Sequence, residues 1–115
     1  MKILTKYPVT LSIKDLYDLT QNPTTKRMQD CKGQQIEVAA YAKYDEINSD
    51  GENVTILAIK TVEGDVVATN SATFIRAFDG IVELCAEFEA VPNIIEVAGG
   101  TTKAGRPYIT CVYIG

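Results

Sequence analysis

The apolar residues change their spacing between positions 66 and 78, and this change sets the boundary between a strand and a helix. Residues 66 to 69 form a short β-branched run that is typical of a strand. Asn70 and Ser71 follow, and both are good helix N-caps. Apolar residues then recur at spacings of three and four, namely Phe74, Ile75, Phe78, Ile81, Val82 and Cys85. We predict a helix that ends near Cys85 or Glu87, and we interpret Gly80 within it as a point of close packing against the sheet.

Two strands are expected before this boundary. Residues 35 to 45 alternate, with Ile36, Val38, Ala40 and Ala42 on one face and Tyr41 and Lys43 on the other. Residues 53 to 62 are apolar on both faces, which indicates a central strand. The turn residues 48 to 51 and 63 to 65 join these runs into a meander.

Two further strands are expected after the helix, over residues 93 to 98 and 107 to 114, with a hairpin loop over residues 99 to 106. The predicted order is therefore β-β-β-α-β-β, which is the connectivity of the OB-fold, a five-stranded, partly open Greek-key barrel. We expect a single domain that is mainly β, with the barrel over residues 34 to 115. The preceding residues 1 to 33 are expected to form an extension with two short helices, over residues 11 to 19 and 23 to 32. Residues 2 to 7 are strand-like, and we expect them to pair with an edge of this barrel or of a neighbouring copy.

Composition narrows the function classes. The chain has no histidine and no phosphate-loop, dinucleotide or nucleophile-elbow motif, so we expect neither an enzyme nor a bound metal or cofactor. Its three cysteines are expected to be buried thiols. No apolar run is long enough to cross a membrane, and we expect a cytoplasmic protein.

The charge is segregated along the chain, although the net charge is −4. Residues 1 to 43 carry seven Lys or Arg against four acids, and residues 97 to 115 carry only two cations. Residues 44 to 96 carry two cations against eleven acids. A basic surface can therefore coexist with an acidic body.

An OB-fold binds its ligand on the face of the second and third strands, between the first and last hairpin loops. In the last loop, Lys103 and Arg106 are the cations expected to contact phosphate, and Thr102 is a neutral donor. Single-strand binding also needs aromatic residues on which bases stack. The candidates are Tyr41, Tyr44 and Tyr108 as aromatic platforms, and Lys26, Arg27, Lys43 and Lys60 as further cations. The alternative interpretation places the tyrosines in the core and leaves the loop as a solvated hairpin.

Three segments carry a resemblance to a known group of proteins: residues 68 to 78 (ATNSATFIRAF), residues 102 to 106 (TKAGR) and residues 108 to 111 (YITC). They resemble small early proteins of phages and mobile elements of Gram-positive bacteria. The resemblance implies single-stranded-DNA binding on an OB-fold. The chain lacks the tryptophan and the long acidic tail of the better-known bacterial single-strand-binding proteins, so recruitment of repair proteins through such a tail is not implied.

We therefore expect a sequence-tolerant single-stranded-DNA-binding protein that acts in phage or plasmid DNA replication or transfer. A homodimer is expected, with host replication or recombination proteins as further candidate partners. The alternative is a module that docks its acidic surface on a host protein. An enzyme with carboxylate chemistry ranks third.

Overall fold

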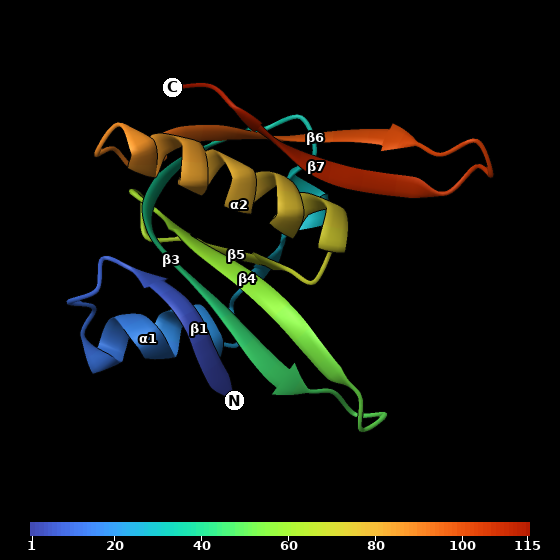
Figure 1. Ribbon diagram of the computed structural model, residues 1–115. Helices are drawn as coiled ribbons and strands as arrows, with labels where there is room; N and C mark the ends of the chain where they lie inside the picture. Colours follow the sequence, from blue (N-terminus) through green and yellow to red (C-terminus); the bar gives the residue numbers. More distant parts are fainter.

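The computed structural model describes all 115 residues and is mainly β, with one curled sheet and two α-helices (Figure 1). The strands are β1 (Lys2–Tyr7), β2 (Lys26–Arg27), β3 (Gln35–Ile47), β4 (Asn53–Thr61), β5 (Val66–Thr69), β6 (Ile94–Thr101) and β7 (Pro107–Tyr113). The helices are α1 (Ile13–Thr20) and α2 (Ala72–Glu87), with a single 3₁₀ turn η1 (Met28–Cys31) after β2. The predicted order of three strands, one helix and two strands is present in β3 to β7. The sheet has seven strands rather than five, because β1 and β2 are added to it.

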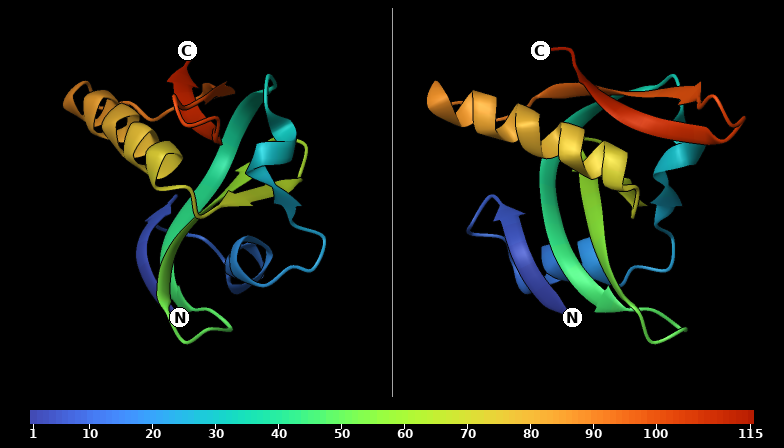
Figure 2. Two further views of the ribbon diagram at one scale, coloured as in Figure 1. Left: turned by 90° about the vertical axis from the view of Figure 1, so that its right-hand side faces the viewer. Right: turned by 45° about the vertical axis from the view of Figure 1, so that its right-hand side comes forward.

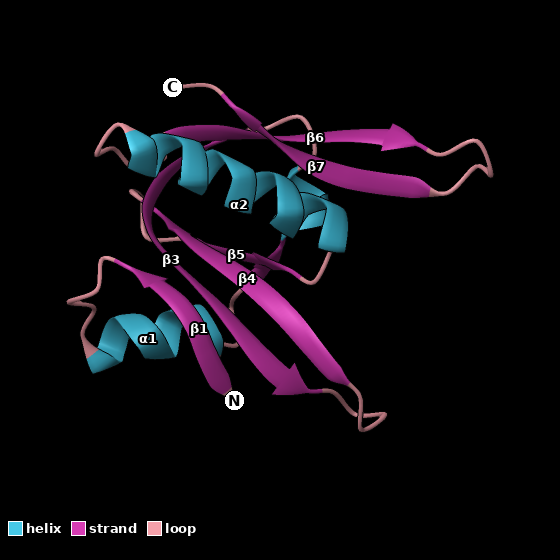
Figure 3. Cartoon of the chain, viewed as in Figure 1, coloured by secondary structure: helices cyan, strands magenta, loops and turns pink.

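The sheet curls because β3 takes part in both of its halves (Figure 3). The strand order is β2-β5-β4-β3-β6-β7, and β1 pairs with β3 as well. The first residues of β3 pair with β6, whereas its later residues pair with β1 on that same side. β1 therefore pairs with the part of the β3 edge that β6 does not reach, and residues 2 to 7 pair within their own chain. β5 and β7 do not pair, so the sheet is not closed into a full barrel.

A β-bulge in β3 corrects the predicted division of its faces. Val38 pairs with Thr61 and Ala40 with Lys60, so Ala39 is an extra residue without a partner in β4. Such a bulge exchanges the two faces of the strand beyond it. Tyr41 therefore joins Ile36 and Val38 in the main core, while the alanines at positions 40 and 42 face the opposite side with Tyr44. The prediction of one uninterrupted alternation from residue 35 to residue 45 was wrong.

Each face of the sheet is covered by one helix (Figure 2). α2 contributes Phe74 and Phe78 to the main core, and the Ser71 hydroxyl caps its first turn by accepting a hydrogen bond from the backbone N–H of Phe74 at 3.2 Å. α1 places Leu19 on the other face. This confirms the predicted long helix and the first of the two N-terminal helices. All three cysteines are buried free thiols. Neither α1 nor α2 combines the length and the apolar character that spanning a membrane requires.

The second predicted N-terminal helix, over residues 23 to 32, is wrong. The side-chain oxygen of Asn22 accepts a hydrogen bond from the backbone N–H of Thr24 at 2.9 Å, which forms a turn where the helix was expected to begin. Lys26 and Arg27 then pair in parallel with β5, and only the short turn η1 follows. The free edge of β5 supplies backbone hydrogen bonds that compete with those of a helix, and Met28 is completely buried from this position.

Gly80 is also placed differently from the prediction. It is exposed on the outer side of α2, and a Cβ atom built on it would meet no atom within 4 Å. Close packing against the sheet therefore does not explain this glycine.

Candidate nucleic-acid interface

The face of the two strands expected to bind ligand is covered by α1. The small side chains of Ala40, Ala42 and Ala58 line this part of the sheet, and Leu19 of α1 packs on it with only 1% of its surface exposed. β4 and β5 correspond to the second and third strands of the predicted barrel. A ligand therefore cannot cross their outer face while α1 is in place.

Lys60, a predicted ligand cation on this face, is held by α1. Its Nζ lies 3.2 Å from Asp18 Oδ2 and 3.4 Å from Asp15 Oδ1. Desolvation by itself would lower the pKa of Lys60, but the hydrogen bonds with the two carboxylates outweigh it and raise that pKa. The charge of Lys60 is thus satisfied within the protein.

Two of the three predicted aromatic platforms lie in the core. Tyr41 is 5% exposed, stacks on Tyr7 with ring centroids 5.5 Å apart, and meets the ring of Phe78 edge-on at 5.0 Å. Tyr44 is 4% exposed, and its hydroxyl donates a hydrogen bond to the Thr20 carbonyl at 3.5 Å. Burial raises the pKa of both phenols. Neither ring is available for stacking with a base.

Two further predicted cations also form ion pairs. Lys43 Nζ lies 2.9 Å from Asp79 Oδ2 of α2, and Lys26 Nζ lies 3.4 Å from Asp65 Oδ2. Arg27 is exposed on β2 and forms no ion pair with an acidic residue. Of the cations predicted outside the last loop, Arg27 is therefore the one left free.

The β6–β7 hairpin, which we call the arm, extends beyond the body of the molecule (Figure 1). Its tip is the turn from Thr102 to Arg106, where the Thr102 hydroxyl oxygen accepts a hydrogen bond from the backbone N–H of Arg106 at 3.1 Å. Gly105 takes the positive φ of 81° that this turn requires. Lys103 and Arg106 are both exposed here without ion pairs, so the arm presents two uncompensated positive charges at its end.

Tyr108, the third predicted platform, lies on the arm and is 41% exposed. It is paired across the hairpin with Gly100, and its ring covers that glycine: a Cβ atom on Gly100 would lie 2.6 Å from the Tyr108 hydroxyl oxygen. The neighbouring Gly99 is in contact with the aliphatic part of Lys32. The two glycines, predicted to make the loop mobile, are instead part of β6 and give room to these two side chains.

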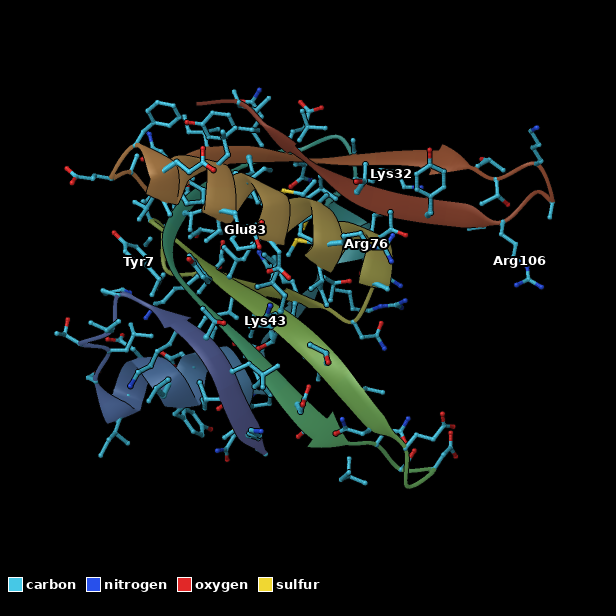
Figure 4. All side chains as sticks on the ribbon, viewed as in Figure 1. Tyr7, Lys32, Lys43, Arg76, Glu83 and Arg106 are labelled. Atoms are coloured by element: carbon cyan, nitrogen blue, oxygen red, sulfur yellow. The ribbon has the colours of Figure 1, made fainter.

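A groove of about 380 Å³ lies between η1, the start of α2 and the first residues of β7, next to the tip of the arm. It is lined by Gln29, Lys32, Ser71, Pro107, Tyr108 and Ile109. Figure 4 shows Lys32 on the arm side of the molecule, with Arg106 at the tip beyond it. The predicted site residues Tyr108, Lys103, Arg106 and Thr102 are thus on one hairpin, whereas Tyr41, Tyr44, Lys43, Lys60 and Lys26 are elsewhere and engaged.

Lys32 is the residue of this region that the sequence prediction did not include. The sequence shows it only as one of three cations in a segment that resembled a helix. Its contact with Gly99, 67 positions along the chain, follows from the pairing of β3 with β6. Comparison with protein-family models, with curated proteins and with solved structures gave no match.

Proposed function

We propose that this protein binds single-stranded DNA through its arm, without enzymatic chemistry and with little sequence preference. The observation that supports this most is the position of the free cations Lys32, Lys103 and Arg106. They lie on or against one hairpin that also carries the exposed ring of Tyr108, whereas Lys26, Lys43 and Lys60 form ion pairs with carboxylates. Backbone-tracking cations together with an aromatic stacking surface are what sequence-tolerant binders of single strands use.

We further propose that the sheet is a variant of the OB-fold. In support, β3 pairs with both β4 and β6, and the single helix α2 lies between the third and fourth strands of that set. Two features depart from that fold: β2 occupies the edge of β5, and α1 covers the outer face of β4 and β5. The departures remove the usual binding face and leave the last hairpin loop as the free part of the expected site.

The mode of binding follows from the number of groups available. Three or four free cations neutralise few phosphates, so stacking on Tyr108 must supply much of the affinity, at about 1–3 kcal/mol for one base. Such a protein suits DNA that is exposed during replication or transfer of a mobile element in the bacterial cytoplasm.

The test is fluorescence polarisation at low salt with a labelled oligonucleotide. A length of about 30 bases exceeds the binding site of one OB-like domain. The double variant Lys103→Glu with Arg106→Glu should lose on the order of 2–4 kcal/mol of binding free energy, because two attractive contacts become repulsive. Its fold should be unchanged, since both residues are exposed in a turn and contribute to no core.

The matched control is Lys2→Glu with Lys6→Glu. It changes the net charge by the same amount on β1, which lies across the molecule from the arm and whose two lysines form no ion pair (Figure 1). Equal losses in the two double variants would show a general charge effect and would contradict an arm site. No polarisation change with wild-type protein would end the proposal and favour the alternative, in which the acidic surface docks on a host protein.

A further inference from the structure

No other element of the chain packs on the outer face of α2, although Arg76 and Glu83 also border hollows between this helix and β1, β3 and β4 (Figure 2). This face carries Thr73, Arg76, Gly80, Glu83 and Glu87, all of them exposed. On its flank, Leu84 is 54% exposed and Phe88 is 75% exposed. These two side chains give one flank of the helix an exposed apolar edge.

The charges of this face are arranged about its middle. Arg76 lies four residues before Gly80 and Glu83 lies three residues after it, and neither forms an ion pair within the chain (Figure 4). The two are separated by about 10 Å along the axis, at 1.5 Å per residue. Asp79, the other acid near Arg76, is already engaged by Lys43. The helix thus has a free positive charge in its first half and a free negative charge in its second half.

Gly80 lies close to the midpoint between these charges, four residues after Arg76 and three before Glu83. A glycine in an exposed helix interior destabilises the helix relative to alanine, and nothing in the single chain requires it. A second helix crossing at this point would approach more closely than any side chain permits. The missing side chain thus leaves room at this point for another backbone.

We propose that α2 packs against α2 of a second copy of this chain, antiparallel and crossing at Gly80. A two-fold axis at that point makes the surface self-complementary, so that Arg76 of each copy faces Glu83 of the other. The same symmetry places Leu84 and Phe88 against the first turns of the partner helix, where Ala72, Thr73 and Ala77 are small. Glu87 lies opposite Thr73 and meets no like charge. This inference is independent of the DNA-binding proposal, because the arm is not part of the interface.

The test is sedimentation velocity without DNA, at protein concentrations from about 1 to 100 µM, which cover weak to moderate association. Wild-type protein should sediment as a dimer at the upper end. Arg76→Glu and Glu83→Arg should each raise the dimer Kd by about tenfold or more, because each places two like-charged pairs across the interface. Both substituted residues are exposed and unpaired, so the fold should remain, as circular dichroism would show.

An equimolar mixture of these two variants is the decisive sample. In a heterodimer of Arg76→Glu with Glu83→Arg, both cross-pairs again join opposite charges, so the mixture should recover the dimer that neither variant forms alone. Glu63→Arg, the same charge change in the turn between β4 and β5, should sediment as wild type does. A wild-type monomer at the highest concentration, single variants that dimerise like wild type, or a mixture that stays monomeric would each overturn the proposal.

Discussion

The ammonium group of Lys60 on β4 lies 3.2 Å from a carboxylate oxygen of Asp18 on α1, and this ion pair fastens the helix to the outer face of the sheet. Asp18 also accepts a hydrogen bond from Lys14 at 2.7 Å and one from Asn22 at 3.2 Å. These hydrogen bonds, that from Lys14 first, outweigh desolvation and lower the pKa of Asp18 from 3.8 to about 2. The attachment of α1 is therefore sensitive to acid.

The protein should lose stability as the pH falls from 3.8 toward about 2. The folded state holds Asp18 ionised at a pH where the unfolded chain binds a proton, so this contribution is complete above the ordinary pKa and is lost as the pH falls through the folded one. Asp18→Asn should lower the melting temperature at neutral pH, and the difference from wild type should shrink across that acidic range. Thermal unfolding followed by circular dichroism measures both. A difference that stays constant down to pH 2 would contradict the role given to the Asp18 carboxylate.

Tyr41→Ala should act on stability. The ring is buried against Tyr7 and Phe78, so its removal leaves a cavity and should cost about 3–5 kcal/mol of unfolding free energy. Urea denaturation measures the loss, with the exposed Tyr17→Ala as the control, expected to cost less than about 1 kcal/mol. If Tyr41→Ala is stable but binds DNA less well, Tyr41 contacts the ligand, and its assignment to the core would be wrong.

Tyr108→Leu should weaken single-strand binding by about 1–3 kcal/mol and leave stability nearly unchanged, because an exposed ring that stacks on a base is lost. Polarisation titrations with the same oligonucleotide measure the effect. Tyr113→Leu provides the comparison, since this tyrosine is similarly exposed at the other end of β7. Equal losses of binding free energy for both variants would contradict a specific stacking role for Tyr108.

The salt dependence of binding should be shallow. With Arg27, Lys32, Lys103 and Arg106 as the free cations of the proposed site, three or four phosphates are neutralised, and the slope of log K against log salt should be about −2 to −3 for a single strand. Titrations at several salt concentrations give this slope. A value near −7, as expected for ten phosphate contacts, would require cations that the structure holds in ion pairs.

Gly80→Ala should raise the unfolding free energy of the monomer by up to about 1 kcal/mol, the difference in helix propensity between the two residues. The measurement is urea denaturation at a protein concentration below the dimer Kd. A decrease in stability would mean that an atom of the same chain already lies against this position.

The sequence was sufficient to predict elements whose signals are local. Strands β3 to β7, the turns between them and α2 with its Ser71 cap follow from apolar period and turn residues, and the structure has each of them. The helix predicted over residues 23 to 32 failed because its cap and glycine signals are local, whereas the competing partner is the distant edge of β5. A single-residue bulge leaves no signal in an alternating run of small apolar residues, so the faces of β3 were assigned in error beyond Ala39.

The candidate site was predictable only where it is local to one hairpin. Lys103, Arg106 and Thr102 lie in a turn whose exposure follows from its composition, and that exposure is present in the structure. The engagement of Lys60 by Asp15 and Asp18, 42 and more positions earlier, depends on how α1 packs on the sheet. The local sequence pattern does not predict ion pairs between residues so far apart in the chain. A strand lysine therefore cannot be recognised as paired before the tertiary structure is known.

The bulge at Ala39 has a consequence for comparing this strand with its counterparts in other barrels. An alignment with any strand that lacks the bulge needs a gap of one residue at this position. Without the gap, the buried ring of Tyr41 is matched to a surface position, and the alanines that receive α1 are matched to interior ones. Homology inferred from an ungapped alignment would therefore score the second half of β3 against the wrong environment, whereas deletion of Ala39 itself would remove the bulge and leave Tyr41 and the alanines on their present faces.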